Sequence, residues 1–190
     1  MPELMVGTST AQWQALVSEA ESACRRSLGE EMQSYLVFLL MRFARRTEVA
    51  AGVLALEYLN GVLLSGRQRL DQLQEVGDKC LLYSGLFPHR AERRRVKISY
   101  YVDLGRSAFS QLAANGRAAT QYALYQNVAD TFVPMMDVLQ AMRTQGGAVA
   151  VLTPLQALEL WQDTGSARAL EELRQTTSGT PIPPGRLQRH

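Results

Sequence analysis

The chain has 190 residues, of which 46% are hydrophobic and 20% are charged, and its formal net charge at pH 7 is +2. A chain of this length buries enough apolar surface to fold as one domain without disulfide or metal support. The near balance of charge and the ordinary apolar fraction exclude a chain that is disordered throughout. They also exclude a protein that binds nucleic acid through a generally basic surface.

The cysteines and the apolar runs of the sequence help to predict the cellular compartment of the protein. Cys24 and Cys80 lie far apart, and no second cysteine or histidine stands at metal-ligand spacing, so we expect two buried free thiols in a reducing cytosol. The first seven residues lack the pattern of a secretory signal. The longest apolar run, residues 35–41, is far shorter than the roughly 20 residues that cross a bilayer. We expect a cytoplasmic protein of bacterial origin with no membrane insertion.

Most of the chain predicts helices. Apolar residues recur three or four positions apart, β-branched residues hardly alternate, and few prolines interrupt the pattern. We therefore expect an all-α fold, a single-domain bundle of about seven or eight helices over residues 1–175. Residues 176–190 are rich in Pro, Gly and Thr, which predicts a flexible, disordered C-terminal tail.

The first two helices are predicted by their ends. Thr10 and its neighbours offer N-caps for the first helix, which we expect to end near Leu28 and Gly29. Glu30 and Glu31 begin the second helix, because carboxylates stabilise the positive end of a helix dipole.

The third and fourth helices are separated by Ser65 and Gly66. The third, residues 48–64, is apolar on nearly every side, which predicts a central element of the bundle. The fourth carries leucines at helical spacing and is expected to stop at Gly85.

A basic cluster follows the fourth helix. Its cationic residues are Arg90, Arg93, Arg94, Arg95 and Lys97. With Glu92 as the one acidic residue, residues 89–97 carry a net charge of +4, so the rest of the chain sums to −2. Guanidinium groups bind phosphates and carboxylates with paired hydrogen bonds, so the cluster is a candidate site for an anion or an acidic partner. The alternative is a solvated basic face whose aliphatic stems cover apolar surface.

Residues 96–104 fit two patterns. Val96, Ile98, Tyr100 and Val102 alternate as in a strand, whereas Tyr101 begins an apolar stripe at helical spacing that continues to residue 112. We favour a helix that ends at Asn115 and Gly116, because no second strand is predicted that could pair with this segment.

Residues 118–144 carry the clearest periodicity. Apolar residues recur at alternating spacings of three and four, at Tyr122, Tyr125, Ala129, Phe132, Met136 and Leu139. Such a heptad seam packs against another helix, either within the bundle or across a dimer. Pro134 lies inside this segment and cannot donate the hydrogen bond to residue 130, so we expect one helix with a kink there.

The last two helices have capping signals. Thr153, Pro154 and Gln156 form a capping box with proline at the first helical position. Ser166 is the expected cap of a final short helix.

Catalytic and metal-binding patterns are sparse. His89 and His190 are the only histidines, and nucleotide-binding glycine loops are absent, so we assign no catalytic residue, metal or cofactor. Two carboxylate pairs have a spacing that fits a shared Mg²⁺, and we interpret both as surface charge: Glu75 with Asp78, and Asp130 with Asp137.

Three functions are compatible with these features. We favour a non-catalytic regulatory or adaptor protein that acts through protein–protein contacts and homodimerises through the 122–139 seam. The first alternative is a module that binds nucleic acid or a phosphorylated ligand through the basic cluster. The second is an enzyme with a helical pocket around Glu57, Asp103 and the tyrosines.

Overall fold

The computed structural model describes residues 10–45, 53–93, 95–116, 118–146 and 152–176, with the side chains of Arg90 and Glu92 left outside the description. Within these ranges the fold is all-α and contains no strand. The helices are α1 (Thr10–Ala23), α2 (Glu30–Ala44), α3 (Leu54–Leu63), α4 (Gly66–Gly85), α5 (His89–Arg93), α6 (Ile98–Asn115), α7 (Ala119–Asp130), α8 (Phe132–Gln145), α9 (Pro154–Thr164) and α10 (Ala167–Thr176). The tail predicted for residues 176–190 lies outside the described residues except for Thr176, which ends α10.

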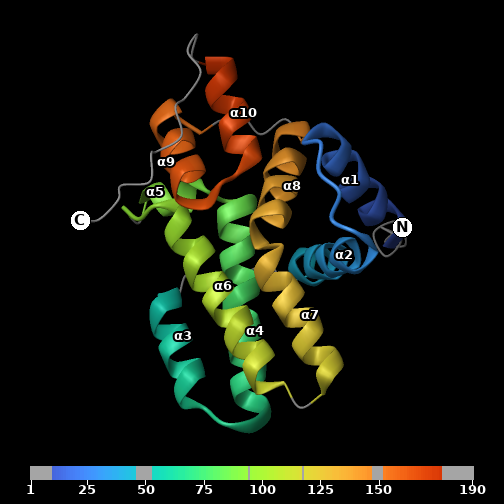
Figure 1. Cartoon of the computed structure of the whole chain (residues 1–190), viewed down its shortest axis with the longest axis vertical. Coiled ribbons are helices and arrows are strands. Elements are labelled where there is room, and N and C mark those ends of the chain that lie inside the picture. The colour runs from blue at the N-terminus through green and yellow to red at the C-terminus, as the bar shows by residue number, and fades with distance from the viewer. Residues whose placement is uncertain (1–9, 46–52, 94, 117, 147–151, 177–190) are drawn as a thin grey trace, which may run out of the picture.

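The helices surround a central pair formed by α4 and α6 (Figure 1). α7 packs along α6, and α8 packs against α4 and α1. α1 also contacts α2, and α9 contacts α10 and the beginning of α6. Long side chains such as Phe109, Phe132 and Leu139 are fully buried between these helices. No helix among the described residues has the length and apolar character that crossing a membrane requires.

Glycine sets how closely the central helices approach. A Cβ atom built at Gly77 of α4 would lie 2.7 Å from the ring of Phe109 on α6. A Cβ atom at Gly105 of α6 would lie 2.5 Å from the ring of Phe132 on α8. Only glycine fits at these positions, so the two rings lie directly against helix backbone.

α1 ends earlier than its sequence predicts. The helix stops at Ala23, and Arg25 adopts the left-handed conformation with φ 52°, so that the backbone N–H of Arg26 bonds to the Glu21 carbonyl at 2.9 Å. Gly29, predicted as the end of the first helix, has φ 79° and instead precedes α2. An arginine therefore occupies the position after a helix where glycine is usual.

The predicted helix 118–144 is two helices, which corrects the expected single kinked element. Thr131, with φ −95° and ψ 8°, separates α7 from α8. Pro134 lies in the first turn of α8, where a missing N–H costs nothing because first-turn N–H groups have no partner within the helix. This division and the short α5 raise the helix count of the described residues above the predicted seven or eight.

Other predictions are confirmed. Residues 98–115 are helical, so the strand alternative for residues 96–104 is wrong. The capping box at Thr153 is present, with the Gln156 N–H donating to the Thr153 hydroxyl and the Gln156 side chain accepting from the Thr153 N–H. Ser166 caps α10 by accepting from the Ala169 N–H at 3.0 Å.

Candidate functional site

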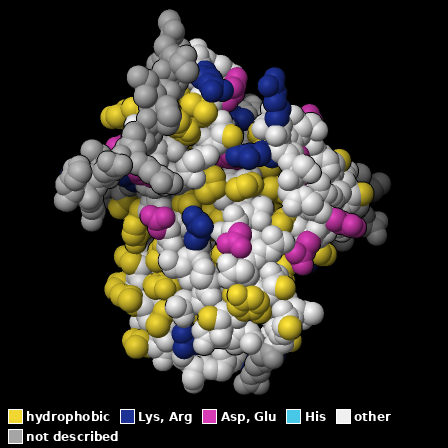
Figure 2. Space-filling view, viewed as in Figure 1, with side chains coloured by type: hydrophobic (Ala, Val, Ile, Leu, Met, Phe, Trp, Pro, Cys, Tyr) yellow, Lys and Arg dark blue, Asp and Glu magenta, His cyan; other side chains and the backbone are white. Residues whose placement is uncertain are grey.

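One face of α3 is an exposed apolar surface. Four side chains that recur at spacings of three and four keep more than half of their area open: Val53 (53%), Leu56 (58%), Leu59 (54%) and Leu63 (84%). We call these residues the α3 face. Figure 2 shows a group of hydrophobic side chains on the part of the surface where α3 lies in Figure 1. Single exposed leucines are common on proteins, whereas a contiguous exposed apolar group along one helix is less usual.

The opposite face of α3 fixes the helix to the bundle. Leu54 and Gly61 are buried, and Tyr58 packs against the core. The ammonium group of Lys79 on α4 lies 2.8 Å from the Glu57 carboxylate. α3 therefore lies on the outside of α4, which corrects its predicted place at the centre of the bundle. The described part of α3 is apolar on both sides, but only one side packs against the bundle, and the other side is exposed.

The described residues of the basic cluster, Arg93, Arg95 and Lys97, are all exposed, and Lys97 differs from the two arginines in its contacts. Arg93 and Arg95 are exposed, whereas Arg94 and the side chain of Arg90 lie outside the described part of the chain. Arg95 has φ 55° and lies two residues after the end of α5, as Arg25 lies two residues after the end of α1. Lys97 is already paired, since its ammonium group lies 3.3 Å from Glu159 and 3.6 Å from Asp163 of α9.

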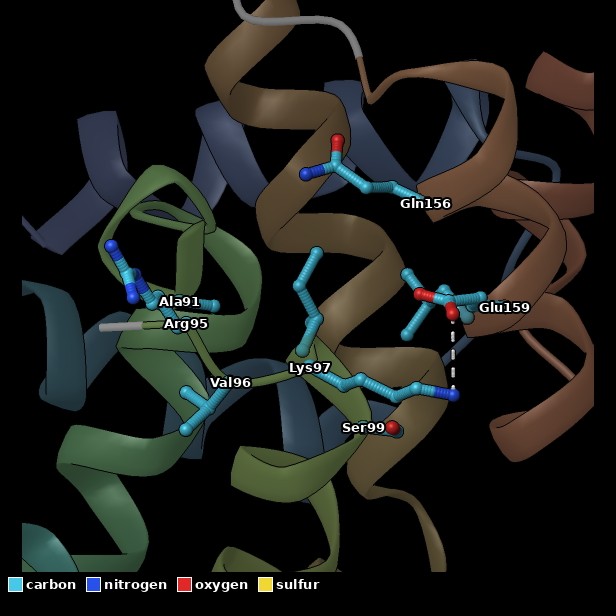
Figure 3. Close-up of a pocket in the computed structure, with 9 residues that line it drawn as sticks. Ala91, Arg95, Val96, Lys97, Ser99, Gln156 and Glu159 are labelled. Carbon is cyan, nitrogen blue, oxygen red and sulfur yellow. Dashed lines mark ion pairs between the residues drawn. The ribbon is translucent and has the colours of Figure 1, made fainter. Parts of the chain in front are cut away.

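A small pocket of about 250 Å³ lies beside Lys97. In Figure 3 Lys97 reaches toward Glu159, whereas Arg95 points in the opposite direction. The Ser99 hydroxyl donates to Asp163 at 2.8 Å. These carboxylates raise the pKa of Lys97, with the Glu159 hydrogen bond as the main cause. Lys97 therefore joins the start of α6 to α9 and is neutralised by the carboxylates of α9.

The predicted seam lies largely inside the protein. Phe132, Met136 and Leu139 are fully buried, Tyr125 is half-buried and Tyr122 is exposed. Of the two alternatives for the seam, the structure supports packing within the bundle for these three buried residues, and dimerisation of the chain stays a prediction. The buried seam residues belong to α8, which packs against α1 and α4.

The two carboxylates interpreted as surface charge at positions 78 and 137 are both buried. Asp78 on α4 accepts a hydrogen bond from the Tyr35 hydroxyl at 2.7 Å and pairs with Arg42, both from α2. Burial raises the pKa of Asp78 to about 6, while Arg42 opposes the shift. These groups border a mainly apolar pocket of about 650 Å³ that Phe38 also lines.

Asp137 occupies a second buried position, beside the segment after α1 and the start of α10. It accepts hydrogen bonds from the Ser166 hydroxyl at 2.5 Å and from Arg26 at 3.2 Å. Burial raises the pKa of Asp137, and the bonds from Ser166 and Arg26 oppose this effect. The carboxylate therefore joins α8 to the segment after α1 and to the start of α10.

The carboxylate pairs and the proposed enzyme pocket do not assemble. Asp78 faces Tyr35 and Arg42, while its pair partner Glu75 lies 3.7 Å from the Lys79 ammonium group. Asp103 is exposed and lines a shallow hollow together with Tyr58, whereas the Glu57 carboxylate pairs with Lys79. Within the described ranges no three His, Cys, Asp or Glu side chains are grouped to hold a metal ion.

Comparison with known proteins gives no relative: no family model, no curated protein and no solved structure matches the chain.

Sequence periodicity could reveal the α3 face only in part. The spacing of its leucines was visible, but the exposure of one side depends on which helices surround α3. The buried carboxylates have no local signal, because Arg42 and Arg26 come from distant segments of the chain.

Proposed function

We propose that the protein is a non-catalytic regulatory or adaptor protein of the cytosol and that it acts through protein–protein contacts made by the α3 face. The observation that carries this proposal is the row of exposed residues Val53, Leu56, Leu59 and Leu63 on a helix whose other side is held by the core. The free thiols of Cys24 and Cys80 are compatible with a reducing compartment.

The α3 face would supply part of the free energy that association requires. Burying about half of a leucine side chain contributes roughly 1 kcal/mol. Three leucines together therefore contribute about 3 kcal/mol, which corresponds to about a hundredfold in a dissociation constant. Because the partner-facing side of α3 is distinct from its core-facing side, the contact requires no rearrangement of the bundle.

The test is a comparison of three proteins by sedimentation velocity over a wide concentration range. They are the wild type, the triple variant Leu56→Gln/Leu59→Gln/Leu63→Gln, and the control Leu16→Gln/Phe38→Gln. The control alters apolar side chains that are exposed elsewhere on the surface, at 45% and 63%. If a second copy is the partner, the wild type and the control sediment as dimers, and the triple variant sediments as a monomer.

If the wild type is monomeric, the partner is a different protein. Affinity capture from extracts of the source cells with the same three proteins as bait then identifies it by quantitative mass spectrometry. The partner must be retained by the wild type and the control and lost with the triple variant. Equal sedimentation and equal capture for all three proteins contradicts the proposal.

The second candidate, binding of nucleic acid or a phosphorylated ligand through residues 89–97, is favoured by one observation. Arg93 and Arg95 are exposed and have no carboxylate partner among the described residues. Fluorescence anisotropy with labelled RNA and DNA at several salt concentrations tests it. Binding should weaken steeply with salt, and Arg93→Ala/Arg95→Ala should reduce that slope. An unchanged slope in the double variant contradicts this candidate.

A further inference from the structure

A second basic site lies far from residues 89–97, where the end of α1 approaches α10. A pocket of about 470 Å³ opens there, a volume within the range of small-molecule sites. Its charged lining consists of Arg25, Arg26, Arg168, Arg174, Glu171 and Glu172. The lining therefore has a formal net charge of +2. Figure 2 shows Lys and Arg side chains at the end of the molecule where α10 lies.

Two of the four arginines in the lining, Arg26 and Arg168, pair with carboxylates among the described residues. Arg26 pairs with the buried Asp137 at 3.2 Å, and Arg168 pairs with Glu172 at 3.2 Å. Arg25 and Arg174 have no carboxylate partner among the described residues. The Nε–H groups of Arg26 and Arg168 are buried without an acceptor in the described ranges. The wall of the pocket therefore contains two N–H donors that form no hydrogen bond within those ranges.

Arg25 adopts a backbone conformation in which glycine is usual. The residue has φ 52°, a conformation that costs an L-residue energy and that glycine adopts freely. Energy stored in an unfavourable backbone conformation is typical of functional positions. Here it places an exposed guanidinium group on the rim of the pocket.

Buried hydrogen bonds hold both walls of the pocket in place. The segment after α1 is fixed by the Glu21 carboxylate, which accepts the Leu28 N–H at 2.7 Å. The start of α10 is fixed by Ser166, which donates to Asp137 and accepts the Ala169 N–H. A site built on restrained elements binds a ligand without the entropic cost of ordering its walls.

We propose that this pocket binds the phosphate monoester group of a small molecule. Such a group carries a charge close to −2 at pH 7, which matches the formal charge of the lining. Two guanidinium groups without carboxylate partners, Arg25 and Arg174, provide the paired donors that phosphate oxygens accept. The volume leaves room for the organic part of the ligand. This inference is independent of the α3 face, which lies at the other end of the bundle (Figure 1).

The binding test uses ¹H–¹⁵N NMR titration of the full chain with AMP, inorganic phosphate and adenosine. We expect AMP to cause saturable shift changes confined to residues 23–26 and 167–175, and adenosine to cause none there. Inorganic phosphate should compete for the same signals. The affinity for AMP should fall as salt is raised, because exposed charges are screened.

Three variants separate the site from general electrostatics. Arg25→Gly/Arg174→Gln should weaken AMP binding at least tenfold, and glycine at position 25 keeps the backbone conformation without strain. Glu171→Gln should strengthen binding severalfold, since it removes an exposed negative charge from the lining. Arg67→Gln is the matched control, because Arg67 is an exposed arginine at the start of α4, at the far end of the bundle.

Several results would overturn the proposal. The absence of saturable shifts with AMP at low salt excludes the site. Equal weakening by the Arg67 variant and by the double variant shows that only net charge matters. Shifts caused by adenosine alone exclude a phosphate-directed pocket, and binding of inorganic phosphate without AMP excludes the monoester as ligand. Thermal melts of each variant verify that the fold is retained.

Discussion

The ring of Phe132 lies directly on the backbone of α6 at Gly105, where an added Cβ atom would be 2.5 Å from the ring. The same hypothetical Cβ atom would be 2.9 Å from the Cβ atom of Cys80 on α4. One glycine therefore allows α4, α6 and α8 to meet at a single point. Phe132 is fully buried as a result, although it is the first residue of α8, directly after the interruption between α7 and α8 at Thr131.

We expect Gly105→Ala to lower the free energy of unfolding by about 1 to 3 kcal/mol, because neither an aromatic ring nor a Cβ atom can move aside cheaply in a packed core. This cost exceeds the roughly 1 kcal/mol that alanine gains over glycine within a helix. Urea denaturation measures the difference. Gly146→Ala is the control, since its nearest neighbour would be 3.6 Å away. Equal stability of Gly105→Ala and wild type would show that the contact between these helices is loose.

The two sides of α3 should respond differently to truncation. Leu54→Ala removes a side chain that is 3% exposed and should destabilise the protein by about 2 to 4 kcal/mol. Leu63→Ala removes one that is 84% exposed and should change stability by less than about 0.5 kcal/mol. Thermal or chemical denaturation of the isolated chain measures both values. Similar losses for the two variants would mean that the α3 face is covered in solution.

Asp78 should make stability fall as pH rises. Burial raises its pKa from 3.8 to about 6. The folded protein therefore binds the proton more tightly than the unfolded chain. The resulting stabilisation is complete below the unfolded pKa and is lost as pH rises through about 6. Asp78→Asn should remove this loss, so relative to wild type the variant gains roughly 2 to 3 kcal/mol between about pH 4 and pH 7.

Urea denaturation at a series of pH values measures this difference. Asp71→Asn, which changes an exposed carboxylate on the same helix, serves as the control. A difference between Asp78→Asn and wild type that is constant with pH would contradict the raised pKa.

Ser166 and Thr153 allow a comparison of two helix caps. Both side chains accept an N–H at the start of a helix, but the Ser166 hydroxyl also donates to the buried Asp137 carboxylate. Thr153→Ala should cost about 1 kcal/mol, as is usual for an N-cap. Ser166→Ala should cost about 2 to 4 kcal/mol, since it also leaves a buried acceptor with one partner fewer. Equal losses in thermal melts would indicate that Asp137 finds water instead.

The features that could be predicted from the sequence are those that depend on residues close together in the chain. The all-α class follows from periodicity, and the start of α9 follows from the capping box at Thr153. The break at Thr131 was not predicted, because a heptad pattern continues through it without interruption. Periodicity reports which side chains are buried and says little about which helix buries them. For the same reason α3 was expected at the centre of the bundle.

The candidate sites depend on contacts between distant segments. The basic cluster was visible as a run of charge, but the pairing of Lys97 with Glu159 and Asp163 requires α9 to pack beside α6. The pocket between α1 and α10 combines arginines that are separated by more than 140 positions in the chain. No local pattern brings such residues together, so only the folded structure reveals the second basic site.

The break at Thr131 also fixes a rotational register. Successive residues of an α-helix are rotated by about 100° around its axis. One residue inserted or deleted at the break would turn α8 by that angle relative to α7. Phe132, Met136 and Leu139 would then leave the core together, and the Asp137 carboxylate would turn away from Ser166. The length of this one-residue joint therefore determines both the packing of the bundle and the shape of its second basic site.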